Sequence, residues 1–133
     1  MQVTPYLYFR GACEDALKFY QSCGIGEIRL LWIYEGTPMA ERDGGVWRDK
    51  VLHSLFEGPG LRLFAGDGPD SEPMKGSALL IEENDLEKAQ ALFATLSAGG
   101  RVTVSFKQQS WGDTYGNFTD KFGVQWAVNS SAR

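Results

Sequence analysis

The chain contains a single histidine, His53, and it stands in the middle of the apolar run VLHSLF. An imidazole titrates close to neutral pH, so His53 could act as a general base or as a hydrogen-bond donor to a ligand. The alternative is a structural role, in which the ring bonds a neighbouring side chain at the edge of the core. Both interpretations stay open, and His53 is a candidate catalytic residue.

Arg62 is the second candidate for chemistry, because it stands among aromatic residues in LRLFAGD. A guanidinium that is buried without a carboxylate is costly, so we expect Arg62 to need an anionic ligand, Asp67, Asp113 or water. Its tentative catalytic role is to stabilise an oxyanion. Each aromatic residue nearby could instead belong to the core. The residues expected to surround a ligand are Tyr6, Tyr8, Phe64, Trp111 and Asp113.

The two cysteines, Cys13 and Cys23, do not suggest nucleophilic or metal chemistry. We expect both on one helix, where ten residues span about 15 Å, whereas a disulfide needs Cα atoms within about 7 Å. Free thiols are therefore predicted. An apolar helix face raises the pKa of a thiol and makes it a poor nucleophile. With one histidine in the chain, no Cys–His zinc spacing exists.

Two helices are predicted from apolar residues at helical spacing. The first lies within residues 11–24 and ends at Gly24. The second lies within residues 84–100, with Asn84 as its N-cap and Glu87 at the third position of a capping box. Their apolar stripes are Cys13, Ala16, Leu17 and Tyr20 in the first helix and Leu86, Ala89, Phe93 and Leu96 in the second.

The other predicted elements are strands. In residues 5–9, Leu7 and Phe9 share one face, and Tyr6 and Tyr8 share the other. Residues 37–50 are predicted to be a long polar loop, and GDGPDSEPMKG at 66–76 a linker. The remaining strands are predicted at 27–36, 50–58, 61–67, 77–83, 101–109, 115–120 and 124–129, with a tight turn at 58–60.

The predicted order is strand, helix and three strands, repeated once. The fold class is therefore α+β, with two βαβββ modules at about 1–68 and 74–129 in one domain of residues 1–133. A chain of this length suits a single domain. Each module alone would expose an apolar sheet face, so we expect modules to pair within the chain or between chains.

Composition excludes several classes of protein. The net charge is -4 and no basic block stands out, which argues against nucleic acid as a partner. No apolar stretch approaches the ~20 residues of a membrane helix. The first residues lack a signal-peptide pattern, so a cytoplasmic location is expected. No glycine-rich turn joins a strand to a helix, so no nucleotide cofactor is expected.

Three stretches resemble the vicinal oxygen chelate superfamily, which includes glyoxalase I, bleomycin-resistance proteins and extradiol dioxygenases. They are PYLYFRGACEDALKFY, VLHSLF and WGDTYGNFTDKFGVQWAVN, and they are most similar to the PhnB-like branch. The chain has Lys121 where that pattern usually has proline. The resemblance implies that the sheets curl into a cup with the helices outside. It also implies a homodimer whose modules could be exchanged.

In relatives that use a metal, up to four inward-facing His or Glu side chains hold a divalent ion. The resemblance places these slots at Thr4, Arg62, Gly76 or Ser77, and Ala127, although a register slip of one residue would exchange the faces. None of these residues offers a carboxylate or an imidazole. Arg62 would also repel a cation, so no metal site is expected.

Three functions are compatible with these patterns. The first is a PhnB-like protein that binds a small, aromatic or anionic molecule without a metal. The second is a glyoxalase- or dioxygenase-type enzyme that holds a metal through an unrecognised set of ligands. The third is a cofactor-free enzyme in which His53 is the base and Arg62 stabilises an oxyanion.

Overall fold

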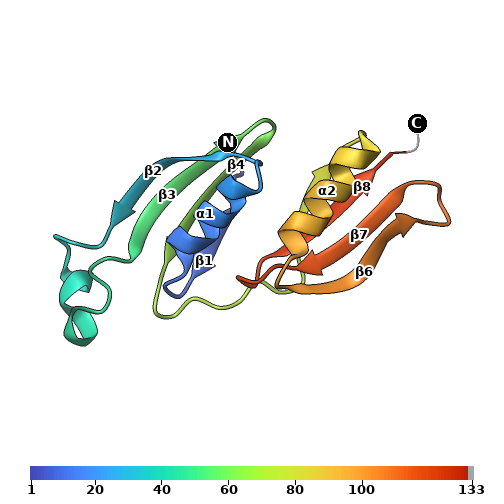
Figure 1. Ribbon diagram of the computed structural model, residues 1–133. Coiled ribbons are helices and arrows are strands. Elements are labelled where there is room, and N and C mark those ends of the chain that lie inside the picture. Colours follow the sequence, from blue (N-terminus) through green and yellow to red (C-terminus); the bar gives the residue numbers. More distant parts are fainter. Residues whose placement is uncertain (132–133) are drawn as a thin grey trace. The chain divides into compact units, whose positions relative to one another are not determined.

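The computed structural model describes residues 1–131 and divides the chain into two units, Met1–Pro73 and Met74–Arg133. In each unit a strand is followed by a helix and three strands (Figure 1). The predicted α+β class and the double βαβββ order are therefore confirmed. That the two modules make up a single domain stays a prediction.

The first unit is a four-stranded mixed sheet with one helix on it. The strand order is β1-β4-β3-β2; β1 runs parallel to β4, and the other neighbours are antiparallel. The parallel pair needs a crossover, and the helix lies within that crossover. The elements are β1 (Tyr6–Phe9), α1 (Cys13–Ser22), β2 (Glu27–Ile33), β3 (Val51–Gly58) and β4 (Leu61–Asp67).

Helix α1 covers one face of this sheet and contributes its predicted stripe to the core. Its stripe residues Cys13, Ala16, Leu17 and Tyr20 have no exposed surface. The ring of Tyr20 meets that of Phe56 edge-on, with centroids 6.3 Å apart. Leu7 and Phe9 are also buried, so the face predicted for the first strand is confirmed.

Asp67 fastens three segments of the first unit together. Its Oδ1 accepts hydrogen bonds from the backbone N–H groups of Gly11 (2.7 Å) and Cys13 (3.0 Å), where α1 begins. Its Oδ2 accepts from the N–H of Val51 (2.9 Å), at the start of β3. A carboxylate is favourable beside the positive end of a helix. The sequence predicted a strand over 61–67 and a linker over 66–76, which overlap at Asp67. The strand is confirmed, because Asp67 is the last residue of β4 and is buried.

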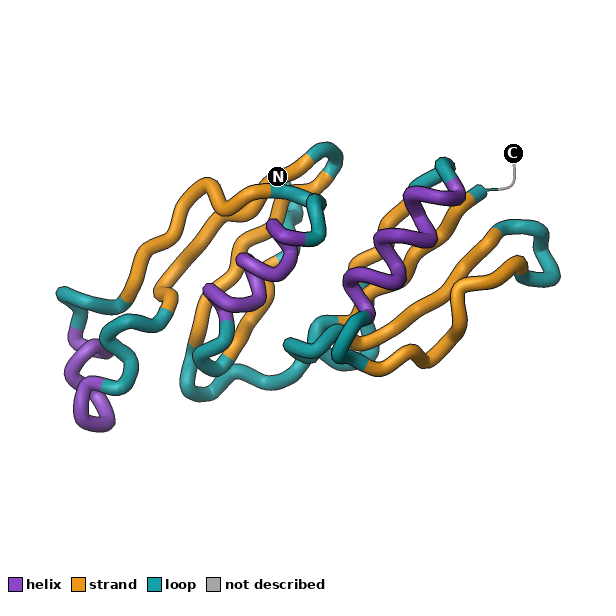
Figure 2. Tube along the Cα trace, in the orientation of Figure 1, coloured by secondary structure: helices purple, strands orange, loops and turns teal. Residues whose placement is uncertain are grey.

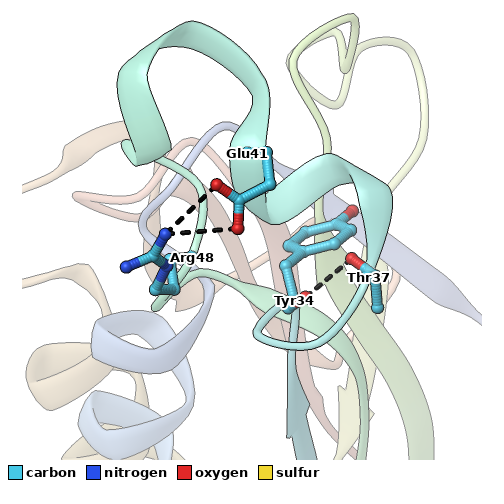
Figure 3. A network of polar contacts seen from close by, with 4 residues as sticks. All are labelled: Tyr34, Thr37, Glu41 and Arg48. Carbon is cyan, nitrogen blue, oxygen red and sulfur yellow. Dashed lines mark hydrogen bonds and ion pairs between the residues drawn. The ribbon is translucent and has the colours of Figure 1, made fainter.

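The segment between β2 and β3 is folded, although the sequence predicted a polar loop. It contains the 3-10 helix η1 (Pro38–Gly45), whose turns are visible in Figure 2. Figure 3 shows how the segment is held: the Thr37 hydroxyl donates to the Tyr34 carbonyl (2.6 Å), and Arg48 donates to Glu41 (3.2 Å). Trp47 packs edge-on against Tyr34. Short-range polar contacts of this kind give a polar sequence a fixed shape without an apolar stripe.

The second unit repeats the arrangement. Its strand order is β5-β8-β7-β6, and β5 runs parallel to β8. Helix α2 packs against β6, β7 and β8 (Figure 1). The elements are β5 (Leu79–Glu82), α2 (Leu86–Ser97), β6 (Arg101–Gln108), β7 (Thr114–Thr119) and β8 (Gln125–Ser130).

The start of α2 differs from the prediction. The N-cap is Asp85, whose Oδ1 accepts from the N–H of Lys88 (3.2 Å), whereas Asn84 accepts from the N–H of Ser131. The helix begins one residue later than expected, so Glu87 cannot complete a capping box. Leu86 is 51% exposed because it stands at the first helical position, so the stripe consists of Ala89, Phe93 and Leu96.

The turn before β8 is confirmed as predicted. Gly123 donates its N–H to the carbonyl of Asp120 (3.0 Å), and the Asp120 carboxylate accepts from the indole N–H of Trp126 (2.9 Å). Trp126 and Val128 are fully buried. The most recognisable motif of the sequence is therefore largely structural.

As predicted, neither cysteine forms a disulfide; Cys13 is buried and Cys23 is half-buried. Within residues 1–131, no helix has the length and apolar character that crossing a membrane requires.

Candidate functional site

The sheet face of the first unit opposite α1 carries a cluster of rings. Alternation along each strand sends these side chains away from the helix. Two of the rings are largely exposed, Tyr8 (64%) and Trp32 (56%). We call the cluster the aromatic face; it consists of Tyr6, Tyr8, Trp32, His53 and Phe64.

His53 lies at the centre of the aromatic face. Its ring centroid is 5.1 Å from that of Phe64, 5.8 Å from that of Tyr6 and 5.9 Å from that of Trp32. These neighbours come from three other strands, because Trp32 pairs with His53 across β2 and β3, and Tyr6 pairs with Phe64 across β1 and β4. Directly opposed residues on adjacent strands lie close enough for their rings to touch.

Tyr6 and His53 are joined by a hydrogen bond between the phenolic oxygen and Nδ1, at 3.1 Å. Burial, and to a smaller extent Tyr8, raises the pKa of the Tyr6 hydroxyl above its ordinary value. Tyr6 therefore keeps its proton at neutral pH and can donate it to a neutral imidazole. The other ring nitrogen, Nε2, has no hydrogen bond to any residue within 1–131. Nε2 is therefore available to a ligand.

Arg62 differs from its prediction in both burial and partner. Its side chain is 41% exposed, and its Nε lies 3.4 Å from Oε2 of Glu57. Glu57 stands directly opposite Arg62 on β3. The partner of Arg62 was predicted to be Asp67 or Asp113, but it is the carboxylate of Glu57 on the neighbouring strand. The guanidinium also lies over the ring of Phe64, at 4.8 Å. Its charge is thus already balanced, and its proposed catalytic role stays a prediction.

An open groove of about 640 Å³ begins beside Tyr6 and Tyr8. We call it the tyrosine groove. Gly66 lets it form, because a Cβ there would lie 2.9 Å from the carbonyl oxygen of Leu52 and 3.1 Å from the Tyr6 hydroxyl. A ring can approach the backbone this closely only at glycine. The lining residues are Tyr6, Tyr8, Tyr34, Met39, Arg42, Leu52 and Gly66 to Glu72.

Two predicted ligand-binding residues, Trp111 and Asp113, belong to the second unit. Trp111 is 61% exposed in the turn between β6 and β7, and its ring lies 6.1 Å from that of Tyr115. Asp113 accepts a hydrogen bond from the side chain of Asn129 (3.1 Å). Their role in ligand binding stays a prediction.

The slots that relatives use for a metal do not fit one here. Thr4, Arg62, Gly76 or Ser77, and Ala127 supply no carboxylate and no imidazole. Among residues 1–131, no three His, Cys, Asp or Glu side chains gather closely enough to hold an ion. Divalent sites need several such ligands directed at one point.

Sequence reasoning missed Trp32, Tyr34 and Leu52 as parts of the site. Trp32 was placed on a strand but on neither face. A register shift between Ile28 and Leu30 interrupts the alternation before Trp32. Tyr34 follows that strand, and its hydroxyl donates to the carbonyl of Asp67 (2.5 Å), a contact between residues far apart in sequence. The aromatic residues of LLWIY could have indicated a ligand-binding strand, but the sequence analysis assigned Trp32 and Tyr34 no role.

A family model described as 3-demethylubiquinone-9 3-methyltransferase matches residues 1–129. The chain belongs to this family. The resemblance to the PhnB-like branch that was stated from the sequence is confirmed, and structures of a PhnB protein and of a bleomycin-binding protein share the fold.

Several relatives share most of their length with this PhnB-like chain. Protein PA1353 from Pseudomonas aeruginosa is 30% identical, covers 98% of each chain and superposes with a TM-score of 0.85. The PhnB protein from Bacillus cereus is 21% identical, with a TM-score of 0.81 over 98% of this chain and 100% of its own. Protein YjdN from Escherichia coli is 27% identical over 97% of this chain and 95% of its own.

A more distant structure shows the fold alone. It is a bleomycin-binding protein solved with bleomycin, 19% identical to the PhnB-like chain, with a TM-score of 0.61 over 98% of each.

Proposed function

We propose that this chain binds a small organic molecule on the aromatic face of its first unit. The observation that carries the proposal is His53, which stands among three rings with Nδ1 engaged by Tyr6 and Nε2 available. Exposed apolar patches are costly and commonly mark binding surfaces. Tyr8 and Trp32 are the most exposed rings of such a patch.

The chemistry of the face favours a flat, aromatic ligand with one polar group. Rings of the ligand can stack on Trp32 and Tyr8, since offset aromatic pairs are attractive beyond the area that they bury. A hydroxyl or carbonyl on the ligand can bond Nε2 of His53. The bleomycin-binding relative supports small-molecule binding as a use of this fold. The class of ligand proposed here is argued from the rings of the aromatic face.

A metal has no part in the proposed binding, because the slots offer no fitting ligands. Elemental analysis of protein purified without chelators is expected to find no stoichiometric divalent ion. A stoichiometric ion that disappears in His53→Ala would favour a metal-dependent enzyme instead.

A methyltransferase activity, which the family description names, has little support from the strand-to-helix turns. A nucleotide-type ligand would bind N–H groups at the start of a helix. At α1, the N–H groups of Gly11 and Cys13 already bond Asp67. The site's own geometry therefore favours binding on the open sheet face.

A cofactor-free enzyme is the second candidate, and the free Nε2 of His53 favours it. In the tautomer in which Nδ1–H donates to the Tyr6 oxygen, Nε2 of His53 would accept a proton from the substrate, while Arg62 would stabilise the charge that develops. The pairing of Arg62 with Glu57 weakens its part in this mechanism. A rate that depends on His53 and follows its titration would distinguish this enzyme from a binding protein.

The binding proposal is tested by native mass spectrometry with a panel of small aromatic molecules at millimolar concentration. Trp32→Ala is expected to remove most of the binding, because it deletes an exposed ring without disturbing the core. The matched control is Val102→Ala, which truncates an exposed apolar residue of the second unit. Binding that survives Trp32→Ala unchanged, or no bound molecule across the panel, contradicts the proposal.

A further inference from the structure

The tyrosine groove continues from the aromatic face and carries charges that the face lacks. Tyr6 and Tyr8 belong to both, and their rings are stacked with centroids 4.8 Å apart. The volume of about 640 Å³ is within the usual range for small-molecule sites. A ligand on the aromatic face would therefore extend into this groove.

Three carboxylates line the groove, and none has an ion pair within residues 1–131. Asp70 and Glu72 are exposed, and Asp67 is buried with only backbone N–H donors at its carboxylate. The single guanidinium of the lining, that of Arg42, has its nearest carboxylate outside the lining, in Asp43 at 3.9 Å. The groove is thus acidic in balance.

Two hydrogen bonds hold the backbone of the segment that carries Asp70 and Glu72. Arg10 donates from Nε to the carbonyl of Ser71 (2.6 Å), and Ser71 donates its N–H to Gly68 (3.2 Å). Arg10 does not line the groove. The segment that carries Asp70 and Glu72 is therefore attached to the sheet beside the tyrosines.

We propose that the tyrosine groove selects an organic cation, a protonated amine or quaternary ammonium attached to an aromatic ring. The faces of tyrosine rings attract cations, most strongly where water is partly excluded. Unpaired carboxylates nearby add attraction of the same sign. This inference rests on the proposed function: the ligand's ring occupies the aromatic face, and its cationic group lies in the groove. It replaces the anionic ligand that Arg62 suggested from the sequence.

The test uses three phenols that differ only in the para substituent: 4-(trimethylammonio)phenol, neutral 4-tert-butylphenol and anionic 4-hydroxybenzenesulfonate. Dissociation constants are measured by following the imidazole signals of His53, the only histidine of the chain. The cation is expected to bind about tenfold more tightly than the neutral phenol at low ionic strength, and this preference should shrink with added salt.

Variants identify the source of the preference. The double substitution Asp70→Asn with Glu72→Gln is expected to weaken binding of the cation about fivefold and to leave the affinity for the neutral phenol unchanged. Tyr8→Leu should weaken binding of the cation by about the same factor. Arg42→Gln removes the positive charge that lines the groove, so it should strengthen binding of the cation. The matched control is Glu35→Gln with Asp49→Asn, two exposed carboxylates outside the lining.

The outcomes separate the two proposals. Equal affinity for the cation and the neutral phenol, or a preference that survives Asp70→Asn with Glu72→Gln, overturns the cation inference and leaves binding on the aromatic face intact. Failure of all three phenols to bind, by calorimetry as well as by the His53 signals, overturns both. A cation that binds with the expected salt and variant dependence but leaves His53 unmoved supports the groove and contradicts the aromatic face.

Discussion

His53 and Cys13 lie on opposite sides of the first sheet, His53 in β3 on the open side and Cys13 in helix α1 on the covered side. His53 stands on the open side of β3, half-exposed, and keeps one ring nitrogen for a ligand. Cys13 stands on the helix side, has no exposed surface and lies 3.9 Å from the hydroxyl of Ser54. Burial, reinforced by the charge of Asp67, raises the pKa of the Cys13 thiol to about 12. Cys13 is therefore inert at neutral pH, as the sequence predicted.

The Cys13 thiol makes stability depend on pH in the alkaline range. Between its ordinary pKa of 9.0 and the folded value of about 12, the unfolded chain has released this proton and the folded chain has kept it. The free energy of unfolding therefore falls as pH rises through this range, by at most about 1.4 kcal/mol per pH unit from this group. Urea unfolding at pH 8.5 and 10.5 measures the slope.

Cys13→Ala should flatten that slope, whereas Cys23→Ala, the matched control, should keep it. Tyr6 and Tyr34, whose pKa values burial also raises, contribute to the slope as well. Cys13 is a smaller cause of the raised pKa of Tyr6, so Cys13→Ala should also reduce the Tyr6 contribution. Equal slopes in Cys13→Ala and the wild type would show that the thiol ionises as easily in the folded chain as in the unfolded one.

At the scale of elements, Asp67 joins three of them. Asp67 ends β4, caps the start of α1, bonds the first N–H of β3, and receives the hydroxyl of Tyr34 on its backbone carbonyl. The same contacts set the tyrosine groove, since Asp67 and Tyr34 line it. Folding and the site are therefore coupled through this residue.

Asp67→Ala should lower the free energy of unfolding by about 3 kcal/mol or more, because it leaves several buried N–H groups without a partner. Asp67→Asn should lower the free energy of unfolding by less, since its amide oxygen can still accept the hydrogen bonds of one of the two carboxylate oxygens. Asp85→Ala, at the exposed N-cap of α2, is the control and should cost about 1 kcal/mol. Urea unfolding compares the three, and an Asp67→Ala loss no larger than that of Asp85→Ala would refute the fastening role.

The order of elements could be predicted because it depends on local spacing. Apolar residues at helical intervals marked both helices, and Asp120 with Gly123 marked a turn. Contacts between distant strands could not be predicted in the same way. The pairing of Arg62 with Glu57 needs the register of β3 with β4.

The candidate site was predicted in part. His53, Tyr6, Tyr8 and Phe64 were named from the sequence, and the structure brings them together on one face. Trp32 was not assigned to it, because a bulge decides which way its ring points. No alternation rule survives such a shift.

For the whole molecule, we propose a homodimer, whose modules could be exchanged between the two chains. Each unit has a sheet with one face covered by a helix and an opposite face that bears exposed apolar side chains, among them Trp32 and Leu80. Such faces are commonly buried against another sheet. Sedimentation velocity at micromolar concentration is expected to give a species of twice the 14.7 kDa chain mass. A stable monomer at that concentration contradicts the proposal.

Binding at the aromatic face is tested most directly by a long-range ¹H–¹⁵N spectrum of the imidazole, recorded during titration with 4-tert-butylphenol. Because the chain has one histidine, its two ring nitrogens need no further assignment. We predict a saturable shift of Nε2 that is larger than that of Nδ1, which Tyr6 already engages. Trp32→Ala should abolish the shift. Saturated binding by calorimetry with both nitrogens unmoved would contradict a ligand site at His53.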